Sequence, residues 1–206
     1  IAGGNGDYGD LAIIKDVTNY GTVNATANTA GGIVGHNSYG FLNNTVNYGA
    51  VSTAQSTVGG IAGATSRFTI TKAINYGEVK GTSRVGGIVG AFLGNFIDQA
   101  INYGNVSSVY HNVGGIVGSI ENPLTIQDVT NHGNVTGLDY VGGVTANLSP
   151  DSTVLRAQNH GSVNGTKFIG GIAGFSGGSI RVATNRGRVT GNSNVGGIHG
   201  RGMHDD

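Results

Sequence analysis

Seven tandem copies of one short unit make up most of this 206-residue chain. Each copy holds an Asn, a planar side chain, a Gly, a variable residue and a Val, and a Gly-Gly pair follows within a run such as Val-Gly-Gly-Ile-Val-Gly. The motif asparagines lie 26 to 29 residues apart, at Asn19, Asn47, Asn75, Asn102, Asn131, Asn159 and Asn185. A fixed period of about 20 to 50 residues is typical of a solenoid, a propeller or another repeat array. No other feature constrains the fold as strongly.

Each repeat contains three short segments that we expect to be strands. The first is Gly-x-Val-x-Gly, as in residues 77–81, the second is Val-Gly-Gly-Ile-Val-Gly, as in residues 85–90, and the third leads to the next Asn, as in residues 68–74. Alternating β-branched residues and glycine boundaries favour strands over helices. Three short strands per coil of about 28 residues, stacked on their counterparts, predict an all-β fold, a parallel β-helix (β-solenoid) of about seven coils.

We expect a single β-solenoid repeat domain over residues 1–206, whose core is marked by three apolar ladders. Its repeats start near residues 19, 47, 75, 102, 131, 159 and 185, after a partial repeat over residues 1–18. The first ladder is Val23, Val51, Val79, Val106, Val135, Val163 and Val189; the second is Ile33, Ile61, Ile88, Ile116, Val144, Ile172 and Ile198; the third is Ile14, Leu42, Ile70, Ile97, Ile126, Val154 and Ile180. Near-identical apolar residues in three independent phases indicate inward positions.

The glycines and the motif asparagines have structural roles in this interpretation. The chain contains 40 Gly, and a coil of short strands needs residues that allow positive φ or a close backbone approach at its corners. Each motif Asn is expected to turn inward, where its amide bonds the Asn of the next coil and nearby backbone groups. Loss of one amide would leave its hydrogen-bond partners unsatisfied and lower the free energy of unfolding by about 1–3 kcal/mol.

In tandem, Asn-Tyr-Gly-x-Val-x-Gly and Val-Gly-Gly-Ile-Val-Gly resemble the GLUG repeat, over essentially all of residues 1–206. That repeat occurs in large secreted and wall-attached bacterial proteins, among them IgA1-type zinc metallopeptidases. The resemblance implies an extracellular β-helical module at the cell surface, beside an enzyme or in place of one. The metallopeptidase chemistry belongs to a His-Glu-x-x-His helix, and no such motif occurs in this sequence.

The residue after each motif Asn forms a second column, which is a candidate binding surface. Its members are Tyr20, Tyr48, Tyr76, Tyr103, His132, His160 and Arg186. Such groups, repeated coil upon coil, could form a platform for sugar rings or for a host protein. Planar side chains also stack well at the spacing of neighbouring strands, which alone would explain the column. A second candidate edge is the variable turn after the Gly-Gly segment, where Pro123 and Pro150 both lie.

The two ends of the chain differ in charge, and neither resembles a capping repeat. The formal net charge is zero, but acidic residues gather near the start and basic residues near the end. The residues concerned are Asp7, Asp10 and Asp16, and Arg186, Arg188 and Arg201. An uncapped solenoid offers open strand edges. We therefore expect end-to-end contacts with further repeats or with other copies of the chain, in which these charges meet.

Several other functions find little support. A net charge of zero does not indicate nucleic-acid binding, and no run of 18 apolar residues predicts membrane insertion. A metal site at His132 and His160 would lack further ligands, and no cofactor motif is present, so we expect neither metal nor cofactor. Glycoside cleavage needs paired carboxylates, whereas the acids occupy different phases of the repeat. These acids are Glu78, Asp98, Glu121, Asp128, Asp139 and Asp151.

The sequence therefore predicts a non-catalytic, extracellular structural or adhesive repeat module: a stalk, a spacer or a head-to-tail filament subunit of a bacterial surface protein. The principal alternative is a carbohydrate-binding or host-protein-binding module that uses the Tyr/His column or the variable turn edge. Ice binding and a β-helical polysaccharide-degrading enzyme are further alternatives by analogy of fold alone.

Overall fold

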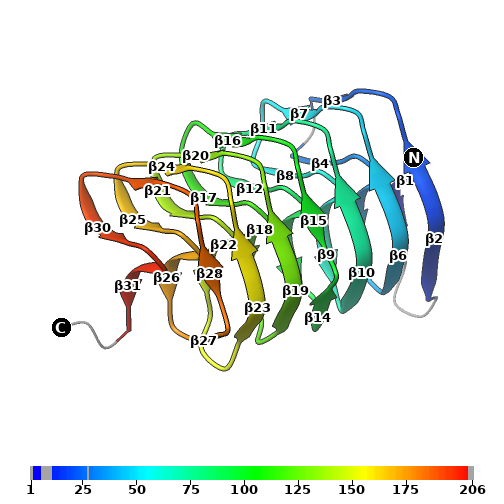
Figure 1. Cartoon of the computed structure of the whole chain (residues 1–206). Helices are drawn as coiled ribbons and strands as arrows, with labels where there is room; N and C mark the ends of the chain where they lie inside the picture. Colours follow the sequence, from blue (N-terminus) through cyan, green and yellow to red (C-terminus); the bar gives the residue numbers. More distant parts are fainter. Residues whose placement is uncertain (1, 6–10, 27, 204–206) are drawn as a thin grey trace.

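A computed structural model describes residues 2–5, 11–26 and 28–203 of the chain. In this part of the chain every regular element is a strand, and the strands stack into a parallel solenoid of about seven coils (Figure 1). The strand pairings join equivalent positions of adjacent repeats, as in Asn47 with Asn75 and Val51 with Val79. The predicted all-β solenoid with a coil of about 28 residues is confirmed. We number the coils 1 to 7 by their motif asparagines, from Asn19 to Asn185.

Four parallel sheets, here named A to D, run along the solenoid. Sheet C contains β3 (Val23–Ala25), β7 (Val51–Thr53), β11 (Val79–Gly81), β16 (Val106–Ser108), β20 (Val135–Thr136), β24 (Val163–Asn164) and β29 (Val189–Thr190). Sheet D contains β4 (Thr29–Gly31), β8 (Thr57–Gly59), β12 (Arg84–Gly86), β17 (His111–Gly114), β21 (Asp139–Gly142), β25 (Lys167–Gly170) and β30 (Ser193–Gly196). Sheet A contains β1 (Ala2–Asn5), β5 (Val34–Asn37), β9 (Ala62–Ser66), β13 (Val89–Leu93), β18 (Val117–Ile120), β22 (Thr145–Leu148), β26 (Ala173–Ser176) and β31 (His199–Gly202). Sheet B contains β2 (Ala12–Asn19), β6 (Gly40–Asn47), β10 (Phe68–Asn75), β14 (Phe96–Asp98), β15 (Ile101–Asn102), β19 (Thr125–Asn131), β23 (Thr153–Asn159), β27 (Ser179–Arg181) and β28 (Thr184–Asn185).

The Gly-Gly pair divides the second predicted segment into two strands, so a coil visits four sheets where the sequence predicted three strands. Each sheet D strand ends at the first Gly of the pair, and the sheet A strand begins three residues later, as at Gly86 and Val89. The bend is tight, because a Cβ at Gly86 would lie 2.0 Å from the carbonyl oxygen of Val89. Only a residue without a side chain fits such a close backbone approach. The sequence did not predict this bend, because the apolar residues on both sides of the pair read as one continuous strand.

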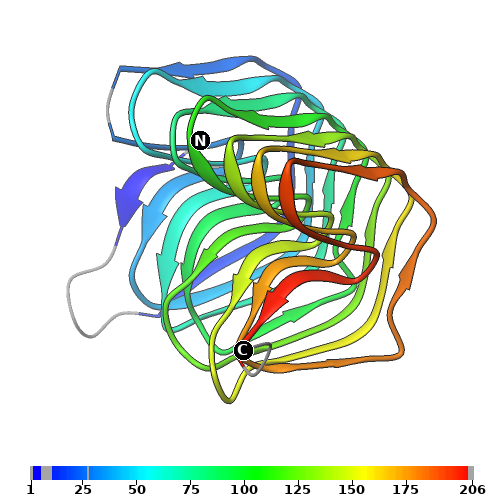
Figure 2. The same ribbon diagram turned by 90° about the vertical axis from the view of Figure 1, so that its left-hand side faces the viewer.

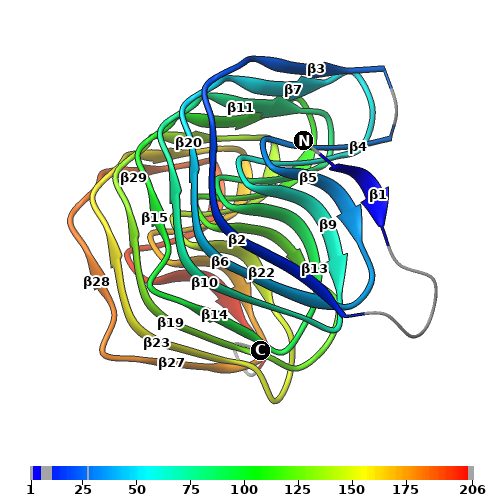
Figure 3. The ribbon, with the colours of Figure 1, turned by 90° about the vertical axis from the view of Figure 1, so that its right-hand side faces the viewer.

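The core consists of two apolar clusters. The ribbon encloses a wide lobe between sheets A and B and a narrow lobe between sheets C and D (Figures 2 and 3). The wide lobe holds the ladders of Ile14 and Ile33, and the narrow lobe holds the ladder of Val23. From the second to the sixth member, the side chains of all three ladders are 0–1% exposed. The ladders face inward as predicted. Each buried aliphatic side chain contributes about 1.5–3 kcal/mol relative to an exposed one, so stability grows with every added coil.

Sheet B contains one residue with left-handed backbone geometry in every coil, which the sequence did not predict. These residues, with φ of 51–56°, are Asp16, Asn44, Lys72, Gln99, Asp128, Arg156 and Val182. Each interrupts the alternation of side chains, so that two successive residues point outward. In β10, for example, Ile70 and Ala73 are buried, whereas Lys72 between them is exposed. Asn and Asp tolerate this geometry, but it is unfavourable for the β-branched Val182.

Candidate functional site: the inner and outer columns

The motif Asn side chains form a continuous inner column along the solenoid. From Asn19 to Asn159, each amide Nδ2 donates a hydrogen bond to the Oδ1 of the motif Asn in the next coil, over 2.8–2.9 Å. In all seven coils the Nδ2 also donates to the carbonyl oxygen of the Gly two residues on, over 2.7–3.0 Å. The five central residues, from Asn47 to Asn159, are 0% exposed. The structure places all seven motif asparagines in this column.

The inner column packs against the Gly-Gly pairs, between the two lobes of the core. A Cβ on the second Gly of a pair would lie 2.4–2.5 Å from the side-chain amide carbon of the next motif Asn, as between Gly87 and Asn102. The Gly-Gly pair therefore leaves the space that the amide fills. This contact explains physically why the two halves of the repeat motif recur with the same period.

The residues after the motif asparagines form an outer column of stacked rings. From Tyr20 to His160, neighbouring ring centroids lie 4.8–5.1 Å apart and the ring planes differ by at most 9°. Rings at this separation attract one another. They also cover one another's faces: Tyr48, Tyr76 and Tyr103 are 43–47% exposed, against 77% for Tyr20 at the end. The column thus presents a row of ring edges and phenol hydroxyl groups, not a face-on platform for sugar rings.

The surface beside the outer column is aliphatic in coils 2–4 and polar in coils 5–7. The residue before each motif Asn also faces outward. This neighbour is the exposed Thr18 in coil 1, the half-buried Val46, Ile74 and Ile101 in coils 2–4, and Thr130, Gln158 and Thr184 in coils 5–7. The outer column changes from Tyr to His and Arg at the same point, and Arg186 donates to the Oε1 of Gln158 over 3.2 Å. The strip is therefore aromatic and aliphatic in coils 2–4, and polar and partly cationic in coils 5–7.

His132 and His160 are stacked neighbours in the polar half, with ring centroids 4.8 Å apart. Partial burial lowers the pKa of His132, and the proximity of His160 lowers it further, because both effects disfavour the charged imidazolium. A zinc site usually takes three or four His, Cys or carboxylate ligands. Among the described residues, no group of three His, Cys, Asp or Glu side chains is placed to hold a metal ion.

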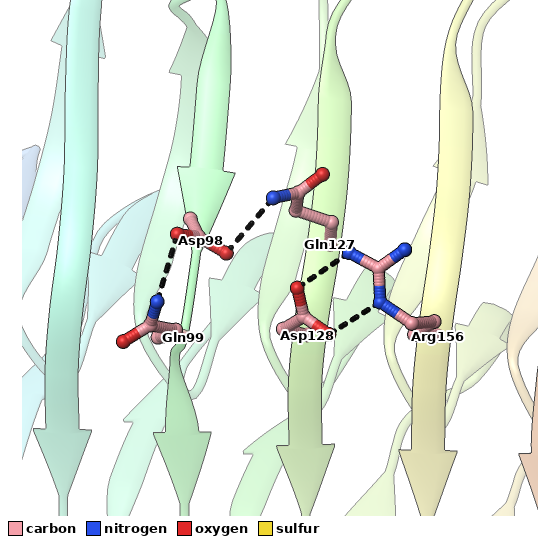
Figure 4. A network of polar contacts seen from close by, with 5 residues as sticks. All are labelled: Asp98, Gln99, Gln127, Asp128 and Arg156. Atoms are coloured by element: carbon pink, nitrogen blue, oxygen red, sulfur yellow. Dashed lines mark hydrogen bonds and ion pairs between the residues drawn. The ribbon is translucent and has the colours of Figure 1, made fainter.

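A polar network on the outer face of sheet B joins coils 4 to 6 (Figure 4). Asp98 accepts hydrogen bonds from the side-chain amides of Gln99 and Gln127, each over 3.2 Å, and Asp128 accepts two from Arg156, each over 2.6 Å. The sequence placed Asp98 and Asp128 in different phases and did not predict that one network would contain both. The left-handed residues account for it, because they turn two successive side chains outward on each strand.

A surface depression lies beside this network. It is lined by Asp128, Thr130, Arg156, Gln158, Val182 and Thr184. The hydrogen bonds and charge of Arg156 lower the pKa of Asp128, so this carboxyl group stays ionised near neutral pH and is a poor proton donor. Glycoside cleavage requires a second carboxyl group that remains protonated, and the six lining residues do not supply one.

The charged residues predicted for end-to-end contacts are described only in part. Asp7 and Asp10 lie outside the described residues. Asp16 is exposed and accepts a hydrogen bond from the side-chain amide of Asn44 over 2.7 Å. The basic residues all lie in the last coil: Arg186, Arg188 and Arg201.

Comparisons with models of protein families, with curated proteins and with solved structures find no match to this chain. The resemblance to GLUG repeats therefore stays a prediction from the motif. Within residues 2–5, 11–26 and 28–203, no helix has the length and hydropathy needed to cross a membrane.

Proposed function

We propose that the chain is a non-catalytic structural module of an extracellular bacterial surface protein, a rigid stalk or spacer with an adhesive outer face. One observation carries the proposal: the inner column connects all seven coils, and its five central amide groups are buried and bonded to the motif Asn on both sides. Such a column resists bending and slippage, because either movement would break hydrogen bonds that water cannot replace in the core.

The resemblance to GLUG repeats supports a location outside the cell and a role at the cell surface. The proposal of a non-catalytic role draws on the state of the carboxylates. Asp98 and Asp128 are bound by amides and a guanidinium, and Glu78 and Glu121 form ion pairs with Lys80 and Arg84. Arg156 lowers the pKa of Asp128, which makes this carboxyl group a poor proton donor and supports a structural role over acid catalysis.

Distance measurements between spin labels test the rigid rod. The sequence contains no Cys, so labels attach only at introduced sites. Ser52→Cys and Asn164→Cys place labels four coils apart on the outer face of sheet C, and stacked strands predict a backbone separation of about 19 Å. We expect one narrow distance distribution. A broad distribution, or one that shifts with solvent conditions that leave the strands intact, would reject a rigid spacer.

The aromatic strip of coils 1–4 favours a second candidate function, the binding of a carbohydrate or a host protein. This function is supported by the row of phenol edges flanked by Val46, Ile74 and Ile101, which offers hydroxyl groups beside apolar surface. A glycan array probed with the chain and with a Tyr48→Ser, Tyr76→Ser double variant tests it. Binding lost in the double variant supports this function, whereas absence of binding by the unaltered chain at high concentration excludes glycans as the ligand.

A further inference from the structure

The surface depression of sheet B lies between two columns of outward side chains in coils 5–7. These columns consist of Asp128, Arg156 and Val182, and of Thr130, Gln158 and Thr184. The residues between the columns belong to the wide lobe of the core, so no outward side chain fills the strip that separates them. The depression has a volume of about 410 Å³. Pockets of about 300–1,000 Å³ hold small ligands, so the space suits one ligand unit.

Five of the six lining side chains can form hydrogen bonds, and several of their polar groups are unused. Within the described residues, the hydroxyl groups of Thr130 and Thr184 have no hydrogen-bond partner, nor has the Nε2 of Gln158. The Oε1 of Gln158 accepts from Arg186 over 3.2 Å, which orients this amide. A hydroxyl group both donates and accepts, and an amide NH₂ group donates. One wall of the depression therefore offers donors and acceptors side by side.

The guanidinium of Arg156 is held in place by Asp128 (Figure 4). Its Nε and Nη2 donate to the two carboxylate oxygens, each over 2.6 Å. This pairing leaves Nη1 without a partner among the described residues, and Figure 4 shows this third nitrogen directed away from the carboxylate. A guanidinium that is already fixed loses little conformational entropy when it binds a ligand. The site thus has a preorganised cationic donor.

Positive charge surrounds the depression. The exposed Arg181 directly precedes Val182 on one side, and the exposed Arg186 contacts Gln158 on the other. Residues 152–203 include six Lys or Arg and no Asp or Glu. Asp128 is the one acid among the lining residues, and Arg156 pairs with it. The surplus of positive charge attracts an anionic ligand and disfavours a cation.

We propose that this depression binds a carboxylate-bearing saccharide, a uronic acid unit of an acidic polysaccharide. Neighbouring hydroxyl groups of a sugar need donors and acceptors close together, and Thr130, Gln158 and Thr184 supply them. The sugar carboxylate forms charge-assisted hydrogen bonds with a guanidinium. Val182 is the one apolar side chain among the six lining residues, so they form no apolar pocket to anchor a peptide side chain.

This inference rests on the proposed function in one respect, the adhesive outer face. It names a ligand class for the polar coils 5–7, whereas the second candidate function concerns the aromatic strip of coils 1–4. The residues that carry it lie on the outer face of sheet B and at its border with the outer column. The spin-label test of the rigid rod is independent of any ligand.

Arg156→Gln tests the site. The variant removes the guanidinium but introduces a residue that adopts the same left-handed geometry at Gln99 in coil 4. Lys72→Gln is the matched control, because Lys72 is a basic, exposed, left-handed residue of the same column in coil 3, away from the depression. Circular dichroism should show the same strand content in both variants as in the unaltered chain.

Isothermal titration calorimetry gives the readout, with tetrasaccharides of galacturonate and of mannuronate and with their uncharged methyl esters. We expect the unaltered chain and Lys72→Gln to bind at least one acidic tetrasaccharide with the same Kd. Loss of a charge-assisted hydrogen bond should weaken binding about tenfold, both in Arg156→Gln and with the ester. Thr130→Val, which removes one hydroxyl group from the wall, should weaken binding about threefold.

Four results would overturn the proposal. The first is no binding of either acidic tetrasaccharide. The second is an equal loss of affinity in Arg156→Gln and Lys72→Gln, which would indicate attraction by charge alone. The third is equal binding of acid and ester, and the fourth is equally tight binding of single-stranded DNA with the same charge. A narrow spin-label distance without saccharide binding would retain the rigid rod and lose this site, so the two failures are distinguishable.

Discussion

The inner and outer columns occupy consecutive residues of the same repeat, yet they tolerate very different substitutions. The inner column is Asn in all seven coils, whereas the outer column holds four Tyr, two His and one Arg. From Asn47 to Asn159, each inner amide bonds to the motif Asn in both neighbouring coils, so that changing one of these members leaves partners on two sides unsatisfied. The outer rings need only a flat neighbour. Reciprocal hydrogen bonding thus determines residue identity, while stacking determines only shape.

The largest expected effect comes from breaking the inner column at its centre. Asn102→Ala leaves the Nδ2 of Asn75, the Oδ1 of Asn131 and the carbonyl oxygen of Gly104 each with one hydrogen bond fewer. At about 1–3 kcal/mol for each buried group, the free energy of unfolding should fall by at least about 3 kcal/mol. Urea unfolding measures it, with Asn19→Ala as the control at the exposed end. Equal losses at the two positions would contradict the role of burial.

The left-handed column of sheet B sharpens the comparison, because the backbone geometry recurs in every coil whereas the side-chain contacts between its members differ from coil to coil. Val182 is 74% exposed and has a φ of 53°. Val182→Asn introduces a residue that tolerates this geometry, as Asn44 does in coil 2, and should raise the free energy of unfolding by about 1 kcal/mol. Thermal unfolding measures the gain. Thr184→Asn, an outward neighbour with ordinary φ, is the control, and an equal gain there would refute backbone strain as the cause.

A change in the outer column should cost less than a change in the inner column. Tyr76→Ala removes two stacking contacts at a half-exposed site, and we expect a loss of about 1 kcal/mol in the free energy of unfolding. Tyr76→His keeps a flat ring, as at His132, and should recover most of that loss. If both variants lose the same amount, the hydroxyl group and not the stacked ring is what stabilises the column.

The smallest expected effect is a pH dependence in the polar half of the outer column. The pKa of His132 lies below its ordinary value of 6.5 in the folded chain. As the pH falls through that value, the unfolded chain takes up a proton more readily than the folded chain, so stability decreases toward acid pH. His132→Tyr should remove part of this decrease, and unfolding of both chains at about pH 5 and about pH 8 checks it. A stability difference between the chains that is the same at both pH values would contradict the assignment.

The sequence predicted the solenoid well because residues one repeat apart in the sequence are the residues that pair between adjacent strands. Residues one period apart, such as Val79 and Val106, become hydrogen-bonded neighbours, so the apolar ladders could be identified from the intervals alone. The inward orientation of the motif Asn followed from the same argument. Patterns that repeat in every coil therefore reveal contacts between coils directly.

Features that depend on backbone geometry within one coil were harder to predict. The bend at the Gly-Gly pair leaves the apolar pattern intact, and the left-handed residue of sheet B shifts the alternation by one position. That shift assembles the network of Asp98, Asp128 and Arg156 from residues that appeared unrelated in phase. The sequence did contain a signal for the left-handed residue. In nearly every repeat a polar residue stands two positions after the inward residue of the Ile14 ladder. The contact between the Asn amide and the Gly-Gly pair likewise joins residues that differ in phase.

The constant register also has a consequence for folding kinetics. Every hydrogen bond between two motif asparagines closes a loop of 26 to 29 residues, whichever coil it belongs to. Adding coils therefore lengthens the rod without adding longer loops, and the relative contact order falls as the array grows. Once one pair of coils has formed, each further coil meets the same modest loop-closure entropy against a ready template. The time needed to extend the rod by one coil should then be nearly independent of how long the rod already is.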